Sequence, residues 1–162
     1  MAAELGHTEI VRILAPLTDN PNSPNTNGVT PIFLAAQHGH LEIVRILVPL
    51  GGFPNSPNKQ GKTPILLATE KGNTEIVKIL APYTGKSSNA SDQEGQTPIH
   101  MAARSGHMEI IRILAPLTDD PNGPNSNGVT PMFLAAQYGH LEIVRFLKGI
   151  IFQIQEKRKL QD

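Results

Sequence analysis

The stretch Gly28-Val29-Thr30-Pro31-Ile32-Phe33-Leu34-Ala35-Ala36-Gln37-His38-Gly39-His40-Leu41-Glu42-Ile43-Val44-Arg45-Ile46-Leu47 decides the fold, because its landmarks return at a fixed interval. Its Thr-Pro pair comes back at residues 63–64, 97–98 and 130–131, which gives spacings of 33, 34 and 33 residues. Its glycine after the alanine-rich run comes back with the same period. A fixed period of this size is the signature of a stacked repeat array, in which each repeat is one structural unit.

Each period predicts two short helices joined by an extended turn. Thr30 is a good N-cap, and Pro31 is tolerated at the first helical position because its missing N–H would be unpaired there in any case. Gly39 is expected to end this helix in the left-handed conformation. A second helix, from about Leu41 to Leu47, carries an apolar stripe at helical spacing, and the proline that follows is expected to end or kink it. Helices this short are marginal alone, so stacking must stabilise them.

A longer repeat lies over the short one. Residues 6–47 and 106–147 align without a gap at an offset of 100 residues, with eight differences in 42 positions. Duplication of a three-repeat block is the simplest history. The same alignment places the start of the chain inside a first helix, at the equivalent of Met101.

The period divides the chain into an array and a tail. The array is expected to span residues 1–148, as a partial repeat 1–24 and four further copies at 25–57, 58–91, 92–124 and 125–148. The tail, residues 149–162, matches no other copy, because Lys148-Gly149 replaces the expected Ala-Pro. Ile150, Ile151 and Ile154 would let this tail cover the end of the array as a capping helix. A partner or localisation signal in the basic run 156–159 and a frayed tail are the alternatives.

The residues of each period resemble the ankyrin repeat family. Residues 97–103, Thr-Pro-Ile-His-Met-Ala-Ala, are similar to the family's Thr-Pro-Leu-His-x-Ala core. Residues 106–114 are similar to its Gly-His-x-x-Ile-Val-x-x-Leu-Leu. The resemblance implies an all-α solenoid of helix–turn–helix units with extended turns or short β-hairpins, as one half-repeat and four further copies. The family's histidine after Thr-Pro is kept only as His100, since Phe33, Leu66 and Phe133 replace it elsewhere.

Composition excludes several classes of protein. The formal net charge is +0, so no overall field favours nucleic acid. The chain has no cysteine, which excludes disulfides, thiol catalysis and cysteine-bound zinc. The N-terminus does not read as a secretory signal, and the apolar run 149–152 is too short to span a bilayer. These features predict a cytoplasmic or nuclear protein without membrane contact.

Catalytic and metal-binding patterns are also missing. Four histidines follow the periodic glycine, as His7, His40, His107 and His140. A residue that recurs once per period is expected to be structural, and the resemblance implies that it braces the loop between the two helices. No carboxylate stands at zinc-ligand spacing from the other two histidines, and no nucleotide-binding loop or nucleophile motif occurs. The sequence therefore predicts no enzyme, no cofactor and no metal site.

What remains is the surface. The resemblance implies that turn tips and first helices line a concave face that binds other proteins. The tip positions are Thr26, Asn27, Val29, Lys59, Gln60, Lys62, Gln93, Glu94, Gln96, Ser126, Asn127 and Val129. The first-helix positions are Gln37, His38, Glu70, Lys71, Arg104, Ser105, Gln137 and Tyr138.

These positions predict a non-catalytic interaction module or scaffold. Arg104, Tyr138 and His38 are the best anchors by type, because aromatic residues and arginine are enriched at binding hot spots. The partners would be other proteins, and the chain itself is expected to be a monomer. The alternative is a structural spacer within a larger multidomain ankyrin-repeat protein.

Overall fold

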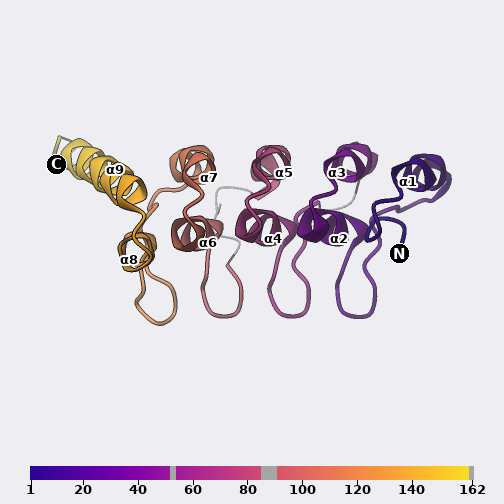
Figure 1. Ribbon diagram of the computed structural model, residues 1–162, viewed down its shortest axis with the longest axis horizontal. Coiled ribbons are helices and arrows are strands. Elements are labelled where there is room, and N and C mark those ends of the chain that lie inside the picture. Colours follow the sequence, from indigo (N-terminus) through magenta and orange to yellow (C-terminus); the bar gives the residue numbers. More distant parts are fainter. Residues whose placement is uncertain (52–53, 85–90, 161–162) are drawn as a thin grey trace.

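The fold consists of helices in two rows (Figure 1). The computed structural model describes residues 1–51, 54–84 and 91–160, and these ranges contain nine α-helices and no strand. The all-α prediction is confirmed. The helices are α1 (Thr8–Leu14), α2 (Pro31–His38), α3 (Leu41–Leu47), α4 (Pro64–Glu70), α5 (Thr74–Leu80), α6 (Pro98–Ser105), α7 (Met108–Leu114), α8 (Pro131–Gln137) and α9 (Leu141–Lys159).

Corresponding helices of successive repeats lie side by side. Figure 1 shows α2, α4, α6 and α8 in one row and α1, α3, α5, α7 and α9 in the other, with all the turn tips on the side of the first row. The core runs between the rows as one cluster from Ala3 to Leu147. Ala35 and Ala36 are fully buried in it, and their small size lets neighbouring helices approach closely. The order of the helices therefore brings every tip and every first helix to the same part of the molecule.

Helices α2, α4 and α8 of the first row begin with a complete set of hydrogen bonds. The hydroxyl of Thr30 accepts the N–H of Phe33 at 3.1 Å, and the Oδ1 of Asn22 accepts the N–H of Ile32 at 3.0 Å. Pro31, the first helical residue, has no N–H to satisfy. The same long-range bond recurs twice: the Oδ1 of Asn55 accepts the N–H of Ile65, and the Oδ1 of Asn122 accepts the N–H of Met132. The Pro/Asn-rich loops before these helices are therefore ordered caps.

Proline decides how the helices of the second row end. After α1, α3, α5 and α7 the chain tightens into a 3₁₀ helix whose second residue is proline. These segments are Ala15–Leu17, Val48–Leu50, Ala81–Thr84 and Ala115–Leu117. Gly149 stands where the others have this proline, and α9 continues past it to Lys159. The predicted effect of the proline is confirmed wherever it is present.

The turn tips contain no strand in the described ranges, so they take the first of the two expected forms, extended turns or short β-hairpins. Two details differ from the sequence-based expectations. Residues 2–6 form turns before α1, because one isolated helical turn is too short to be stable as a helix. The tail is not a separate capping helix, since α9 passes the boundary drawn at residue 148 without a break.

The second half of α9 lies beside the loop between α7 and α8. Ile151, Ile154 and Arg158 line a small hollow together with Asp119 and Asp120 of that loop. Phe133 and Leu141 of the last repeat are exposed.

Candidate protein-binding surface

The turn tips share one backbone design. The Oδ1 of Asn25 accepts the N–H groups of Asn27 at 2.9 Å and Val29 at 3.0 Å, and the N–H of Asn25 donates to the Val29 carbonyl. The same set of bonds is built on Asn58, Asp92 and Asn125. Asparagine therefore does the work of the aspartate that more often begins this turn, because both side chains offer one oxygen to two N–H groups.

Hydrogen bonds join the tips into a row. The N–H of Lys59 donates to the Asn27 carbonyl at 3.0 Å, and the N–H of Ser126 donates to the Glu94 carbonyl at 3.2 Å. Between them, the side-chain amide of Gln93 donates to the Lys59 carbonyl at 3.1 Å. Gly95 makes this approach possible, since a Cβ there would lie 2.8 Å from the Ser126 nitrogen. The tip residues predicted from the sequence thus lie side by side along one edge.

Most of the predicted contact residues are accessible. The four half-buried members of the set are Val29, Gln37, Gln96 and Val129, and the other members are exposed. Gln93 is exposed but its amide already bridges two tips, so part of its role is structural. The remaining side chains are presented to solvent.

Charge is concentrated on the two central tips. Lys59 and Lys62 belong to one tip and Glu94 to the next, and a hollow of about 240 Å³ lies between the tips beside Lys62 and Glu94. The ion pairs among the described residues are all on the second-row helices, for example Glu42–Arg45 and Glu142–Arg145. The tip charges have no such local partner within the described ranges, whereas α1, α3, α5 and α9 each carry an internal pair and Arg112 of α7 lies over the Phe146 ring.

The C-terminal ends of α6 and α8 contribute the best-formed pair of anchors. The guanidinium of Arg104 lies 5.7 Å from the ring centroid of Tyr138, within the range of a cation–π interaction. Tyr138 is 49% exposed, so its ring can contact a partner while Arg104 supports it. At the equivalent place three repeats earlier, His38 stacks on His40 with ring centroids 6.0 Å apart. The structure therefore brings together two anchors that the sequence predicted separately.

The periodic histidines connect neighbouring repeats. The Nε2–H of His40 donates to the Glu4 carbonyl at 3.0 Å, and that of His140 donates to the Arg104 carbonyl at 3.1 Å. Asn73 takes the same position and reaches the Ala36 carbonyl at 3.4 Å. Each bond crosses from the start of a second helix to a carbonyl two or three residues before the periodic glycine of the preceding repeat. The predicted structural role is present, but it links adjacent repeats instead of bracing only the loop of its own repeat.

His100 is a buried link between α6 and the following tip. Its Nε2–H donates to the Val129 carbonyl at 3.0 Å, and its Nδ1 accepts from Thr97. Burial lowers the pKa of His100, and the hydrogen bond to Val129 and the charge of Asp92 oppose this shift. The neutral ring matches these bonds, because a protonated Nδ1 would face the Thr97 N–H as a second donor.

Within residues 1–51, 54–84 and 91–160 no group of three or more histidine, aspartate or glutamate side chains is placed to hold a metal ion. None of the helices in that part of the chain is both long and apolar enough to cross a membrane.

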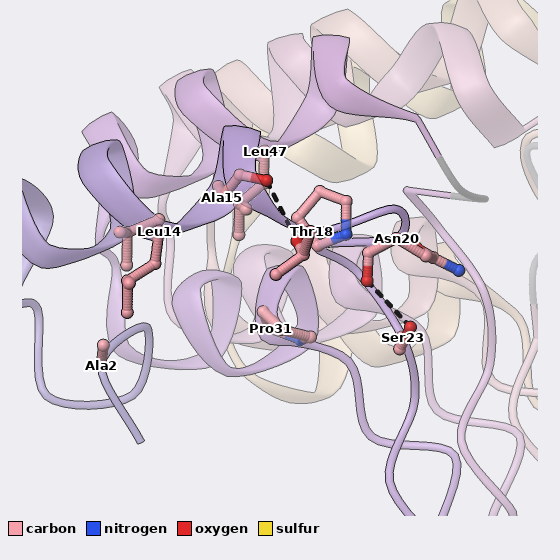
Figure 2. Close-up of a pocket in the computed structure, with 10 residues that line it drawn as sticks. Ala2, Leu14, Ala15, Thr18, Asn20, Ser23, Pro31 and Leu47 are labelled. Atoms are coloured by element: carbon pink, nitrogen blue, oxygen red, sulfur yellow. Dashed lines mark hydrogen bonds between the residues drawn. The ribbon is translucent and has the colours of Figure 1, made fainter.

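A pocket lies away from the predicted surface, at the N-terminal end of the array. The hollow has a volume of about 250 Å³, and Figure 2 shows Leu14 at its left, Ala15 and Leu47 above and Pro31 below.

The comparisons with known proteins agree with the geometry. A family model described as ankyrin repeats (3 copies) matches residues 1–92 and again residues 84–156. Together these matches cover nearly the whole sequence, and the chain belongs to the ankyrin repeat family. A comparison with curated proteins finds no significant match. Ankyrin repeats generally act as protein–protein interaction modules, and the family is typically not enzymatic.

Proposed function

We propose that this chain is a non-catalytic protein-binding module, built as an ankyrin solenoid of one half-repeat and four further copies. Its binding face would consist of the turn tips together with the ends of α2, α4, α6 and α8. The observation that supports the proposal is the difference in ion pairing between the turn tips and the second-row helices. Within the described ranges Lys59, Lys62 and Glu94 form no ion pair on their neighbouring tips, while α1, α3, α5 and α9 of the second row each carry an internal ion pair.

The duplicated blocks support the same assignment. Between residues 6–47 and 106–147 the buried helix positions change only from one apolar residue to another, while His38 becomes Tyr138 on the proposed face. A constant scaffold with a changed aromatic anchor is what two binding subsites of different preference require. We therefore place the main contact at Arg104 and Tyr138, with the Lys59 tip as its charged neighbour.

The test compares two triple variants of the same composition as bait. The first is Lys59→Ala/Arg104→Ala/Tyr138→Ala on the proposed face. The second is Arg45→Ala/Lys78→Ala/Tyr83→Ala, whose residues are exposed on the second helices and the 3₁₀ helix after α5. Proteins that bind the proposed face should be lost from the first bait and retained by the second, as measured by quantitative mass spectrometry of captured material.

The competing function is a structural spacer in a larger multidomain ankyrin-repeat protein, which would use few residues of this face. In that case both triple variants would capture the same proteins as the unaltered chain. Equal capture by the two variants would therefore reject the binding face that we propose.

A further inference from the structure

The four turn tips differ in charge. The outer tips, residues 25–29 and 125–129, read Asn-Thr-Asn-Gly-Val and Asn-Ser-Asn-Gly-Val and carry no charged side chain. The tip at residues 58–62, Asn-Lys-Gln-Gly-Lys, carries two lysines and no acid. The tip at residues 92–96, Asp-Gln-Glu-Gly-Gln, carries two acids and no base. All the tip charge therefore stands on the two central tips, with one sign on each.

The two charged tips are opposite sides of one hollow. Its lining residues are Gln60 and Lys62 from one tip and Asp92, Gln93 and Glu94 from the next. The side-chain amide of Gln93 donates to the Lys59 carbonyl at 3.1 Å, and this bond holds the two tips next to each other. We call residues 58–62 the basic wall and residues 92–96 the acidic wall.

The charges of the two walls do not pair across the hollow. Lys62 and Glu94 are both exposed, and no ion pair joins them among the residues that the structure describes. On α5, by comparison, Lys78 and Glu75 meet at 2.8 Å. The walls therefore present separated charges of opposite sign to anything that enters the hollow.

The charge of Asp92 is not needed to build its turn. Its Oδ1 accepts the N–H groups of Glu94 and Gln96, each at 3.0 Å. The other three tips make the same bonds with a neutral side chain, that of Asn25, Asn58 or Asn125. The negative charge on the acidic wall is therefore additional to the structural role of this position.

We propose that this hollow binds an extended segment of another protein, in which an acidic and a basic side chain lie two or three residues apart. The acidic side chain lies against Lys59 and Lys62, and the basic side chain lies against Asp92 and Glu94. The inference rests on the proposed function, because the hollow is part of the proposed binding face.

The distance between the walls explains the spacing in the segment. Packed helices lie about 8–10 Å apart, which is also the expected separation of equivalent points on neighbouring repeats such as those of α4 and α6. In a β-strand, side chains two residues apart share a face and are separated by about 7 Å. In a polyproline II segment, side chains three residues apart share a face and are separated by about 9 Å. Long charged side chains can bridge the remaining difference.

The lining of the hollow favours a peptide over a nucleic acid. The amide of Gln60 can both donate to and accept from a peptide backbone. A phosphate backbone would be attracted to the basic wall but repelled by the acidic wall, whose charges are equal in number. A segment with one charge of each sign meets attraction at both walls.

Two variants neutralise the walls one at a time. Lys59→Gln/Lys62→Gln removes the charge of the basic wall, and Asp92→Asn/Glu94→Gln removes that of the acidic wall. Each new side chain is the one that the neighbouring charged tip has at the same position, so both turns should be kept. Circular dichroism and thermal unfolding check the fold.

Selection of random peptides displayed on phage gives the readout. The unaltered chain should enrich peptides with an acidic and a basic residue two or three positions apart. The variant of the basic wall should still select the basic residue but lose the acidic one, and the variant of the acidic wall should do the reverse. Glu75→Gln/Lys78→Gln, which removes an exposed ion pair from α5, is the matched control and should select the unaltered motif.

Fluorescence anisotropy with a synthetic peptide of the selected motif measures the size of the effect. Each wall variant should bind this peptide about tenfold more weakly than the unaltered chain, because two exposed charges are lost. Binding to the unaltered chain should also weaken as ionic strength rises.

Several outcomes would overturn the inference. One is a selection that enriches no such motif, and another is the same motif from all four baits. Peptides that need Arg104 and Tyr138 but ignore both walls would overturn this inference and leave the proposed binding face in place. Peptides whose binding survives both wall variants and Arg104→Ala/Tyr138→Ala would reject the proposed function as well.

Discussion

Gly106 and Gly139 share a backbone conformation but differ in their surroundings. Their φ angles are 77° and 78°, yet a Cβ on Gly106 would lie 2.6 Å from the His140 ring, while a Cβ on Gly139 would meet nothing within 4 Å. We expect Gly139→Ala to lower the free energy of unfolding by about 1–2 kcal/mol through left-handed strain. Gly106→Ala should cost about 1 kcal/mol more, because His140 is displaced from the Arg104 carbonyl. Urea denaturation measures both, and equal losses would mean that the histidine bridge contributes no stability.

His100 gives the molecule a stability that depends on pH. Its pKa is lowered from 6.5 by burial, so the unfolded chain binds this proton more readily than the folded chain does. The contribution of neutral His100 to the free energy of unfolding is therefore complete above pH 6.5 and decreases as the pH falls below that value. His100→Phe is the matched control, because phenylalanine occupies the same position as Phe33 and Phe133. The stability of the unaltered chain relative to this variant should increase as the pH rises from acidic to neutral, and a difference independent of pH would contradict the assignment.

At the scale of the element, one residue separates a short helix from a long one. Gly149 takes the place of Pro16, Pro49, Pro82 and Pro116, and α9 runs on to Lys159 where the other second helices stop. Gly149→Pro should end α9 near Leu147, because proline in a helix interior costs about 3 kcal/mol. Far-UV circular dichroism should show the lost helix, and amide exchange should locate the loss in residues 150–159.

Gly149→Ala is the matched control for that substitution. A Cβ at this position meets nothing within 4 Å, so alanine should add about 0.5–1 kcal/mol of helix stability. If the proline variant kept full helicity after residue 149, the role we give to the prolines of the other repeats would be wrong.

Local signals explain why the boundaries of α2 could be predicted from the sequence. The bonds between repeats and the end of α9 could not be predicted in this way. The Thr30 cap and the turn at Gly39 act within a few residues, so the start and end of α2 were predictable. The bridge from His40 to Glu4 spans 36 residues and depends on how repeats stack, which no local pattern encodes. Gly149 carries no stop signal, and the continuity of α9 became visible only in the structure.

The candidate surface was likewise predictable from the sequence only in part. Exposure of the tips followed from the repeat pattern, because residues such as Lys59 and Gln60 occupy turns by sequence alone. The contact of Arg104 with Tyr138 did not follow from it, since the two residues come from different repeats and meet only through stacking.

At the scale of the whole molecule, stability should rise from the N-terminal end toward the middle of the array. In a linear array each repeat depends on its neighbours, and α1 has a neighbour on one side only. The amides of α1 should exchange faster than those of α7, whose Ile110 and Leu114 are buried where Ile10 and Leu14 are not. Hydrogen exchange at low protein concentration measures the protection of the amides in both helices. Equal protection of α1 and α7 would contradict the predicted increase in stability along the array.

The bonds that tie repeats together also set how the array responds to force. The repeats 58–91 and 125–148 are each fastened at two edges, by the Asn73 or His140 bridge on one side and by the tip bond of Lys59 or Ser126 on the other. Within the described residues, 1–24 are joined to the next repeat by the His40 bridge and by no tip bond. Tension applied between the two termini should therefore peel α1 away first, while the doubly fastened repeats behind it hold, so that the chain lengthens stepwise from its N-terminal end.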